Sequence, residues 1–128
     1  MKELSPYKRS SLLAPFNELP HLFAVLNDPC RDGLNLLVMI TSIKEGRIYD
    51  QACVLKSGDH PFIIRPSYLL YRMAETVKTQ HISKMIKSRY YLKKEDFEVP
   101  VFQRIANGIY TSDETKLRIL NYAKANKV

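Results

Sequence analysis

The sequence predicts a mainly β (α+β) fold, a small antiparallel barrel with C-terminal helices beside it. Five short apolar runs follow one another between residues 20 and 78, with no helical periodicity between them. After Thr79 the apolar residues recur at helical spacing instead. The length of 128 residues and the hydrophobic fraction of 45% suit a single domain, 1–128, with its own core.

The first hairpin is predicted around a turn rich in proline and glycine, residues 28–33. The runs 21–27 (HLFAVLN) and 34–41 (LNLLVMIT) flank this turn, and both are apolar nearly throughout. Such runs are typical of strands covered on both faces, so we expect this hairpin to be central and buried. Residues 1–19 are interrupted by prolines, and we expect them to form an N-terminal arm with only local contacts.

The other barrel strands are predicted to lie between this hairpin and residue 78. The apolar runs that carry them are 52–55, 62–64 and 67–71, with 72–78 as an extension of the last. Arg65-Pro66 separates two of these runs. Proline has no backbone N–H and pushes the residue before it toward extended geometry, so Arg65 is expected to project outward from a kink.

Helical spacing governs the C-terminal part of the chain, residues 79–128. Ile82, Met85 and Ile86 fall on one face of a predicted helix whose opposite face carries lysines. An apolar stripe with a charged opposite face is typical of a surface helix that packs on a core.

Two further helices are predicted toward the C-terminus. Pro100 suits the first turn of the earlier helix, and Asn107-Gly108 is a typical stop at its end. A Thr-x-x-Glu pattern from Thr111 to Glu114 is expected to cap the last helix, on which Leu117 faces inward. Both helices are expected to be packing elements.

The positive charge of the chain is concentrated in one segment. The formal net charge is +7, and residues 72–94 contain seven basic side chains against one acidic side chain. A concentrated positive patch favours a polyanionic partner such as RNA, and tyrosines inside it can stack on bases. The predicted nucleic-acid-binding residues are Lys78, Lys84, Lys87, Arg89, Tyr90 and Lys93. The alternative, a solvated lysine-rich face with no partner, stays open.

Several classes of protein and site find no support in the sequence. It has no secretory signal and no apolar stretch of the roughly twenty residues that a membrane span needs, so a cytoplasmic protein with reduced thiols is expected. The three histidines are scattered, and neither a metal site nor a cofactor is predicted. No glycine-rich phosphate loop and no nucleophile triad is recognisable.

The chemistry that remains is cleavage of RNA without a metal. RNA carries its own nucleophile, the 2′-hydroxyl group, so a site needs only to orient it, remove its proton and stabilise charge on the phosphate. The catalytic candidates are Arg65 for charge, Thr41 and Ser67 for phosphate positioning, and His60 for proton transfer. Each alone also has a structural interpretation: a surface ion pair, caps of strand ends, or a hydrogen bond within the histidine's own turn.

Residues 36–42 (LLVMITS) resemble the strand ending in Thr-Ser or Thr-Thr of the MazF/PemK (Kid-like) toxins. The order of elements is similar as well: paired strands, the Thr-Ser loop, a strand of the form x-C-V-L with a glycine turn, the arginine-bearing segment and a C-terminal helix. The resemblance implies a small, dimeric SH3-like barrel. It also implies a metal-independent endoribonuclease that a cognate antitoxin protein inhibits.

By the same resemblance, Thr41 falls on the hydroxyl residue of the family's active groove, and Arg65 on the arginine of the Kid-like branch. Ser67 stands where that branch has a catalytic aspartate, and Pro20-His21 stands where the family has Arg-Pro. These departures remove acid/base groups. His60 or His21 is a candidate to replace them, because histidine titrates near neutral pH.

Two hypotheses of different classes follow. The first is a MazF/PemK-like toxin that cuts single-stranded RNA by 2′-hydroxyl attack, with RNA, an antitoxin and a second copy of the chain as partners and no membrane. The alternative is a non-catalytic SH3-like barrel that binds nucleic acid or a protein through the basic patch, with a steep salt dependence and no product. A purely structural protein would show neither behaviour.

Overall fold

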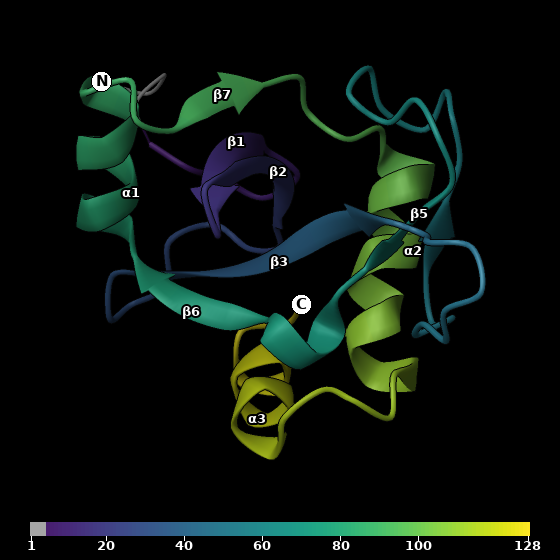
Figure 1. Ribbon diagram of the computed structural model, residues 1–128. Coiled ribbons are helices and arrows are strands. Elements are labelled where there is room, and N and C mark those ends of the chain that lie inside the picture. Colours follow the sequence, from purple (N-terminus) through teal and green to yellow (C-terminus); the bar gives the residue numbers. More distant parts are fainter. Residues whose placement is uncertain (1–4) are drawn as a thin grey trace.

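In the computed structural model, which describes residues 5–128, the strand β3 organises the sheet (Figure 1). β3 (Leu34–Ser42) pairs with β2 (Leu19–Val25) along one edge. Along its other edge it pairs with β6 (Glu75–Lys78) near its start and with β5 (Ser67–Leu69) at its end. The predicted central hairpin of β2 and β3 is confirmed.

The sheet continues outward with β4 beside β5, and with β1 and then β7 beyond β2. All pairings are antiparallel, and three α-helices accompany the sheet within residues 5–128. The predicted α+β class is confirmed. The bounds of these elements are β1 Ser11–Phe16, β4 Val54–Leu55, β7 Leu92–Lys94, α1 Thr79–Lys87, α2 Val99–Thr111 and α3 Leu117–Ala125. The sheet does not close into a full barrel, because no pairing joins β4 to β7 within residues 5–128.

The segment predicted as an arm contains β1, which pairs with both β2 and β7. Asn17 and Glu18 have φ angles of 51° and 70°, as in the two-residue type I′ turn of a tight hairpin. Pro15 and Pro20 are paired opposite each other, at positions where neither strand has a neighbour on its other edge. Their missing N–H groups therefore cost no ladder hydrogen bond. Residues 1–4 of the predicted arm lie outside the described residues.

The run 62–64, predicted as a strand, forms a turn instead. Phe62 N–H donates to the ring nitrogen Nδ1 of His60, and Ile63 N–H donates to the carbonyl of the same histidine. Only Ile63 is buried in the core, whereas its two neighbours are exposed. The stretch that follows is not one strand either. A 3-10 turn, Tyr71–Met73, separates β5 from β6 so that both lie along β3.

The two faces of the sheet bury cores of different size. On one face, side chains of β2, β3 and β5 meet α2 and α3 in a large cluster, whose fully buried members include Leu36, Leu69, Ile105 and Ile119. On the other face, α1 covers a small cluster of Leu12, Val25, Leu37 and Ile82. Because both faces are covered, β2 and β3 are nearly continuous apolar runs.

α1 follows the prediction, but α2 does not end where the sequence suggested. It starts with Pro100 in its first turn and continues through Gly108 to Thr111. Gly108 is buried, and a Cβ atom there would overlap the hydroxyl group of Tyr71, which donates to the Ile105 carbonyl at 2.7 Å. This glycine therefore permits close packing of the helix and does not stop it.

α3 begins later than expected, so the predicted cap at Thr111 is wrong. Ser112 donates to Asp50 and thereby ties the end of α2 to the loop after β3. Leu117, predicted to face inward, is 72% exposed, whereas Ala123 is buried. None of the helices in residues 5–128 is long and apolar enough to span a membrane.

Candidate functional site

A cavity of about 350 Å³ lies where β2 begins and β3 ends, and we call it the strand-end cavity. Its polar lining comes from the start of β2, the end of β3, the loop after β3 and the start of β5. These polar residues are His21, Thr41, Ser42, Lys44 and Ser67. The remaining lining is apolar. A volume in this range with a few converging polar groups is typical of a ligand site.

Strand alternation places two predicted hydroxyl groups on opposite faces of the sheet. In the ladder between β3 and β5, Thr41 pairs with Tyr68 and Ser42 pairs with Ser67. Paired residues share a face, and successive residues on one strand point to opposite faces. The cavity lies at the end of the sheet, so Thr41 and Ser67 both line it, from opposite faces.

Thr41 shares its face with His21 instead. The ladder between β2 and β3 pairs Leu22 with Ile40, so one further step brings His21 opposite Thr41. Opposite residues of an antiparallel pair have Cβ atoms about 4.5–5.5 Å apart. An imidazole ring and a hydroxyl group therefore lie next to each other in the lining of the strand-end cavity.

The ring of His21 is held in one orientation. Its Nδ1 lies 3.1 Å from the carbonyl oxygen of Leu19, and Phe16 packs edge-on against it with 6.1 Å between the ring centroids. A carbonyl oxygen can only accept, so Nδ1 carries the hydrogen and Nε2 keeps its lone pair. No hydrogen bond reaches Nε2 from residues 5–128. The half-buried ring thus offers a nitrogen that can take a proton.

Arg65 does not line the strand-end cavity. Its side chain is exposed and makes no ion pair with the described residues. Its carbonyl oxygen accepts the hydroxyl hydrogen of buried Ser67 at 2.9 Å, and this bond stabilises the kink before Pro66. The three residues predicted to converge, Thr41, Arg65 and Ser67, are therefore not brought to one point.

His60 has a structural position rather than one in the cavity. It is 3% exposed, its Nε2 donates to the Glu95 carbonyl at 2.8 Å, and its Nδ1 accepts the N–H of Phe62 at 3.0 Å. Both ring nitrogens are thereby used, so the assignment of His60 as proton carrier has no support in this geometry. The alternative interpretation, a hydrogen bond within its own turn, describes what is observed.

A metal site is not indicated within residues 5–128, and the buried Cys53 is a core residue. No group of three or more His, Cys, Asp or Glu side chains within residues 5–128 is arranged to hold a metal ion. Cys30 and Cys53 are both free thiols. Burial raises the pKa of the Cys53 thiol, as expected for an inert core cysteine.

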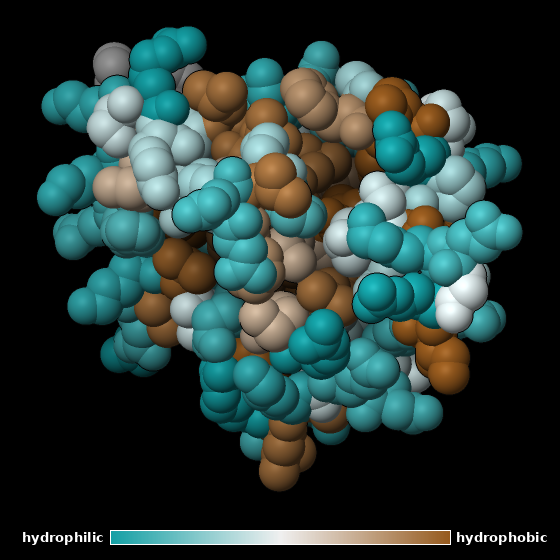
Figure 2. Space-filling view, in the orientation of Figure 1, coloured by the Kyte–Doolittle hydropathy of each residue, from teal (hydrophilic) through white to brown (hydrophobic). Residues whose placement is uncertain are grey.

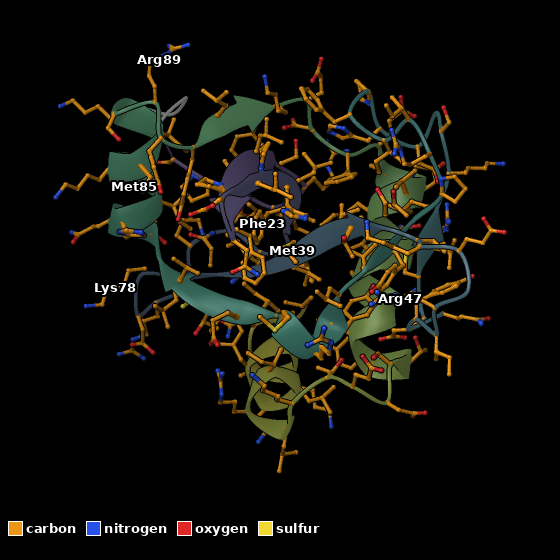
Figure 3. The ribbon with its side chains drawn as sticks, in the orientation of Figure 1. Phe23, Met39, Arg47, Lys78, Met85 and Arg89 are labelled. Atoms are coloured by element: carbon orange, nitrogen blue, oxygen red, sulfur yellow. The ribbon has the colours of Figure 1, made fainter. Side chains whose placement is uncertain are left out.

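The predicted basic patch surrounds a second cavity of about 520 Å³ between the end of α1 and β7, which we call the basic groove. Three of the predicted binding residues, Lys87, Arg89 and Lys93, line it. Lys84 and Tyr90 are exposed, and so is Lys78, which Figure 3 shows at the end of α1 opposite Arg89 and the groove. The groove is completed by Ile86, Tyr91, Leu92 and Lys94.

Lys93 differs from the other cations of the groove because its ammonium group already contacts Tyr7 and Asp96. Its Nζ donates to the hydroxyl of Tyr7, lies 4.5 Å from the centroid of that ring, and stands 3.7 Å from Asp96. Lys84, Lys87 and Arg89 form no ion pair within residues 5–128. These three are the cations best placed to meet a negatively charged ligand.

An apolar floor lies on the face of the sheet that carries His21 and Thr41. Phe23 and Met39 are paired on the face that also carries His21. In Figure 3 they occupy the centre of the view, with Arg47 to one side and α1 to the other, and Figure 2 shows apolar side chains gathered in a central hollow with polar ones around it. The strand-end cavity and the basic groove share no lining residue.

Several residues of both sites were not predicted from the sequence. Ser42 and Lys44 line the strand-end cavity and follow Thr41 within three positions, which was an available signal. His21 was considered but not assigned, although it stands where the resembling family has Arg-Pro. Tyr91 carried a signal as a tyrosine inside the basic segment, whereas His81, which contacts it, carried none of its own.

No protein-family model matches this chain, and no curated protein matches it either. Among solved structures, the chain is similar in fold to a chain of the MazE–MazF complex (Form-II) from Deinococcus radiodurans, with a TM-score of 0.55 and 13% sequence identity. The match covers 84% of this chain and 93% of that chain. At this identity the likeness concerns the fold alone. The antiparallel sheet with its helices is thus the architecture of a component of a MazE–MazF complex, in line with the resemblance noted in the sequence.

Proposed function

We propose that the protein is a MazF-like toxin that cuts single-stranded RNA without a metal. The observation that carries the proposal is the geometry of His21, an oriented imidazole with a free nitrogen beside Thr41 in a cavity that Lys44 also lines. The shared fold with a chain of the MazE–MazF complex supports the same assignment.

The reaction needs a base, a proton for the leaving oxygen and stabilisation of the phosphate charge, and the cavity has groups for the first and the last. Nε2 of His21 accepts the proton of the RNA 2′-hydroxyl while the bond from O2′ to phosphorus forms. The bond from phosphorus to O5′ breaks, and O5′ takes a proton from water, which leaves a 2′,3′-cyclic phosphate and a 5′-hydroxyl. The Lys44 ammonium and the Thr41 hydroxyl hold the phosphate and stabilise its charge.

The test is incubation of purified protein with mixed-sequence RNA in the presence of a chelator. His21→Gln is expected to lower the cleavage rate by roughly 100- to 10,000-fold, the usual loss for a general base. Lys44→Gln is expected to lower it by about 100-fold, and Lys56→Gln, which removes an exposed lysine outside the cavity, serves as its matched control. Absence of product, or full activity in His21→Gln, would end the proposal.

Arg65→Ala decides between the two assignments of charge stabilisation. If the cavity does the chemistry, this variant loses far less activity than Lys44→Gln, because Arg65 does not line the cavity. If Arg65→Ala loses as much cleavage activity as His21→Gln, Arg65 stabilises the phosphate charge, and the loop 56–66 must move to bring it to the cavity. The products are separated on a gel and their ends identified by phosphatase sensitivity.

The partners proposed with this function are an antitoxin protein and a second copy of the chain, in the cytoplasm. The solved neighbour is a MazE–MazF complex, which motivates the first. Co-expression with the product of an adjacent short acidic reading frame should yield a complex that no longer cuts RNA. Light scattering gives the mass of the free protein.

A second candidate function is binding of nucleic acid without cleavage. It is favoured by the basic groove, where Lys87 and Arg89 have no ion-pair partner within residues 5–128. The same assay separates the two functions, because a binding protein retains RNA with a steep salt dependence and yields no product in any variant.

A further inference from the structure

Three aromatic rings border the basic groove. The rings of Tyr90 and Tyr91 are stacked, with 5.9 Å between centroids and 29° between planes. The ring of His81, from the first turns of α1, meets Tyr91 edge-on at 6.2 Å and 84°. Residues ten positions apart thus form one continuous aromatic surface.

Tyr91 anchors this surface to the body of the protein. It packs against the small cluster under α1. Burial, and to a lesser extent the neighbouring Tyr90, raise the pKa of its hydroxyl group. Tyr90 is 62% exposed. A fixed ring therefore supports an exposed ring, so that a planar ligand meeting Tyr90 finds a surface that is already ordered.

The turn that presents Tyr90 is held by backbone hydrogen bonds at the end of α1. Tyr90 N–H donates to the Met85 carbonyl at 2.9 Å, and Arg89 N–H donates to the Ile86 carbonyl at 3.0 Å, the pattern of a Schellman motif. Arg89 occupies the left-handed position of this motif with φ of 65°, where glycine is usual. An arginine there costs stability that a glycine would not, yet it contributes a cation to the groove.

The surroundings of the rings are positively charged. Lys84, Lys87 and Arg89 form no ion pair within residues 5–128. The one acidic residue of the segment 72–94, Glu75, is paired with Arg118 at 2.6 Å on α3, away from the groove. Asp96 pairs with Lys93, whereas Lys84, Lys87 and Arg89 stay unpaired within residues 5–128 and leave a charge that is complementary to a polyanion.

We propose that the rings of His81, Tyr91 and Tyr90, with the cations of Lys87 and Arg89, form a stacking platform for single-stranded nucleic acid that is separate from the strand-end cavity. An unpaired base stacks on the exposed face of Tyr90 while the cations bind the flanking phosphates. A duplex lacks a free base face and gains only the phosphate contacts. The platform goes beyond the proposed cleavage, because it binds without any chemistry at His21.

The experiment measures fluorescence anisotropy of labelled oligonucleotides. The probes are a 2′-O-methyl RNA single strand, which 2′-hydroxyl attack cannot cut, a DNA single strand of the same sequence, and the duplex of each with its complementary strand. Tyr90→Leu is expected to weaken binding of both single strands by roughly 5- to 100-fold. Tyr90→Phe keeps the ring and should change binding by no more than about twofold, and neither variant should alter duplex binding.

Arg89→Gly tests the charge of the platform without harming the fold. It relieves the strain of the left-handed backbone at residue 89, so the midpoint of thermal unfolding should rise. The slope of log K against log salt for the single strand should become less steep by about 0.7, because one phosphate contact is lost. Lys56→Gln removes an exposed cation outside the groove and should leave the slope unchanged. Unfolding midpoints of all variants show that each is folded.

Three results would overturn the platform. The first is single-strand binding that Tyr90→Leu leaves intact, and the second is duplex binding as tight as single-strand binding, which marks a plain polyanion surface. The third is displacement of the oligonucleotide by polyglutamate at equal charge, which marks a surface for an acidic protein. The cleavage assay with His21→Gln reads out the proposed nuclease independently, so either idea can fail while the other stands.

Discussion

On one face of the sheet, α2 and α3 bury a large apolar cluster, whereas on the other face α1 alone covers a small one. The large cluster contains most of the fully buried side chains of the described residues and holds the fold together. The other face keeps His21, Thr41, Phe23 and the aromatic rings near the surface. The heavily packed face therefore supplies most of the stability of the fold, and the lightly covered face carries the groups that can contact a ligand.

The largest effect is expected from crowding the heavily packed face. Gly108→Ala places a Cβ atom into the hydroxyl group of Tyr71, which is buried and hydrogen-bonded to Ile105. We expect a loss of about 3 kcal/mol in the free energy of unfolding, the upper range for overpacking a core. Urea denaturation followed by circular dichroism measures it.

The control for Gly108→Ala is Asn107→Ala, at the exposed neighbouring position of the same helix. It should be neutral or stabilising by a few tenths of a kcal/mol, because alanine has the higher helix propensity. In the double variant with Tyr71→Phe, only a small part of the loss should be recovered, since the hydroxyl oxygen is gone but two ring carbons still overlap the added Cβ. A Gly108→Ala protein more stable than the parent would show that helix propensity outweighs packing here.

A smaller and more local effect is expected from the lightly covered face. Ile82→Ala removes the one fully buried side chain that α1 contributes to the small cluster, at a cost of roughly 2 kcal/mol. Hydrogen exchange should speed up for the amides of α1 and much less for those of α2, because the two helices share no core. Equal acceleration in both helices would mean that the faces unfold as one unit.

The smallest effect concerns the ion pair that links β6 to α3. The hydrogen-bonded Arg118 guanidinium lowers the pKa of the Glu75 carboxyl. A lowered folded-state pKa contributes stability above the unfolded value of about 4.3, and that stability is lost as pH falls through the folded-state value. The parent should therefore exceed Glu75→Gln in urea midpoint at pH 7, and the gap should close toward pH 3.

Both partners of this pair are largely exposed, so the pH-dependent gap should be slight and should shrink further in high salt. Glu45→Gln, which removes an exposed acid with no ion pair in residues 5–128, is the matched control and should show no such gap. A gap that widens as the solution is acidified would have the wrong sign and contradict the assignment.

Elements with strong local patterns were predicted from sequence. The central hairpin was recognised because two long apolar runs flank a turn, and α1 because apolar residues recur at helical spacing on a lysine-rich segment. The charge concentration and the position of Thr41 at the end of β3 were also accessible. Each of these features depends on residues close together in the chain, where periodicity and turn chemistry act.

The rest depended on contacts between distant segments, which local patterns do not record. β1 pairs with β2 in a tight hairpin and is also held by β7 about eighty residues later, and the prolines that suggested an arm occupy edge positions of that hairpin. Gly108 continues a helix because Tyr71 fills its side-chain space. Whether a histidine is a structural hydrogen-bonding group or a proton acceptor is decided by what its ring nitrogens touch. Only the tertiary structure therefore separates His60, with both nitrogens occupied, from His21, with one nitrogen available beside Thr41.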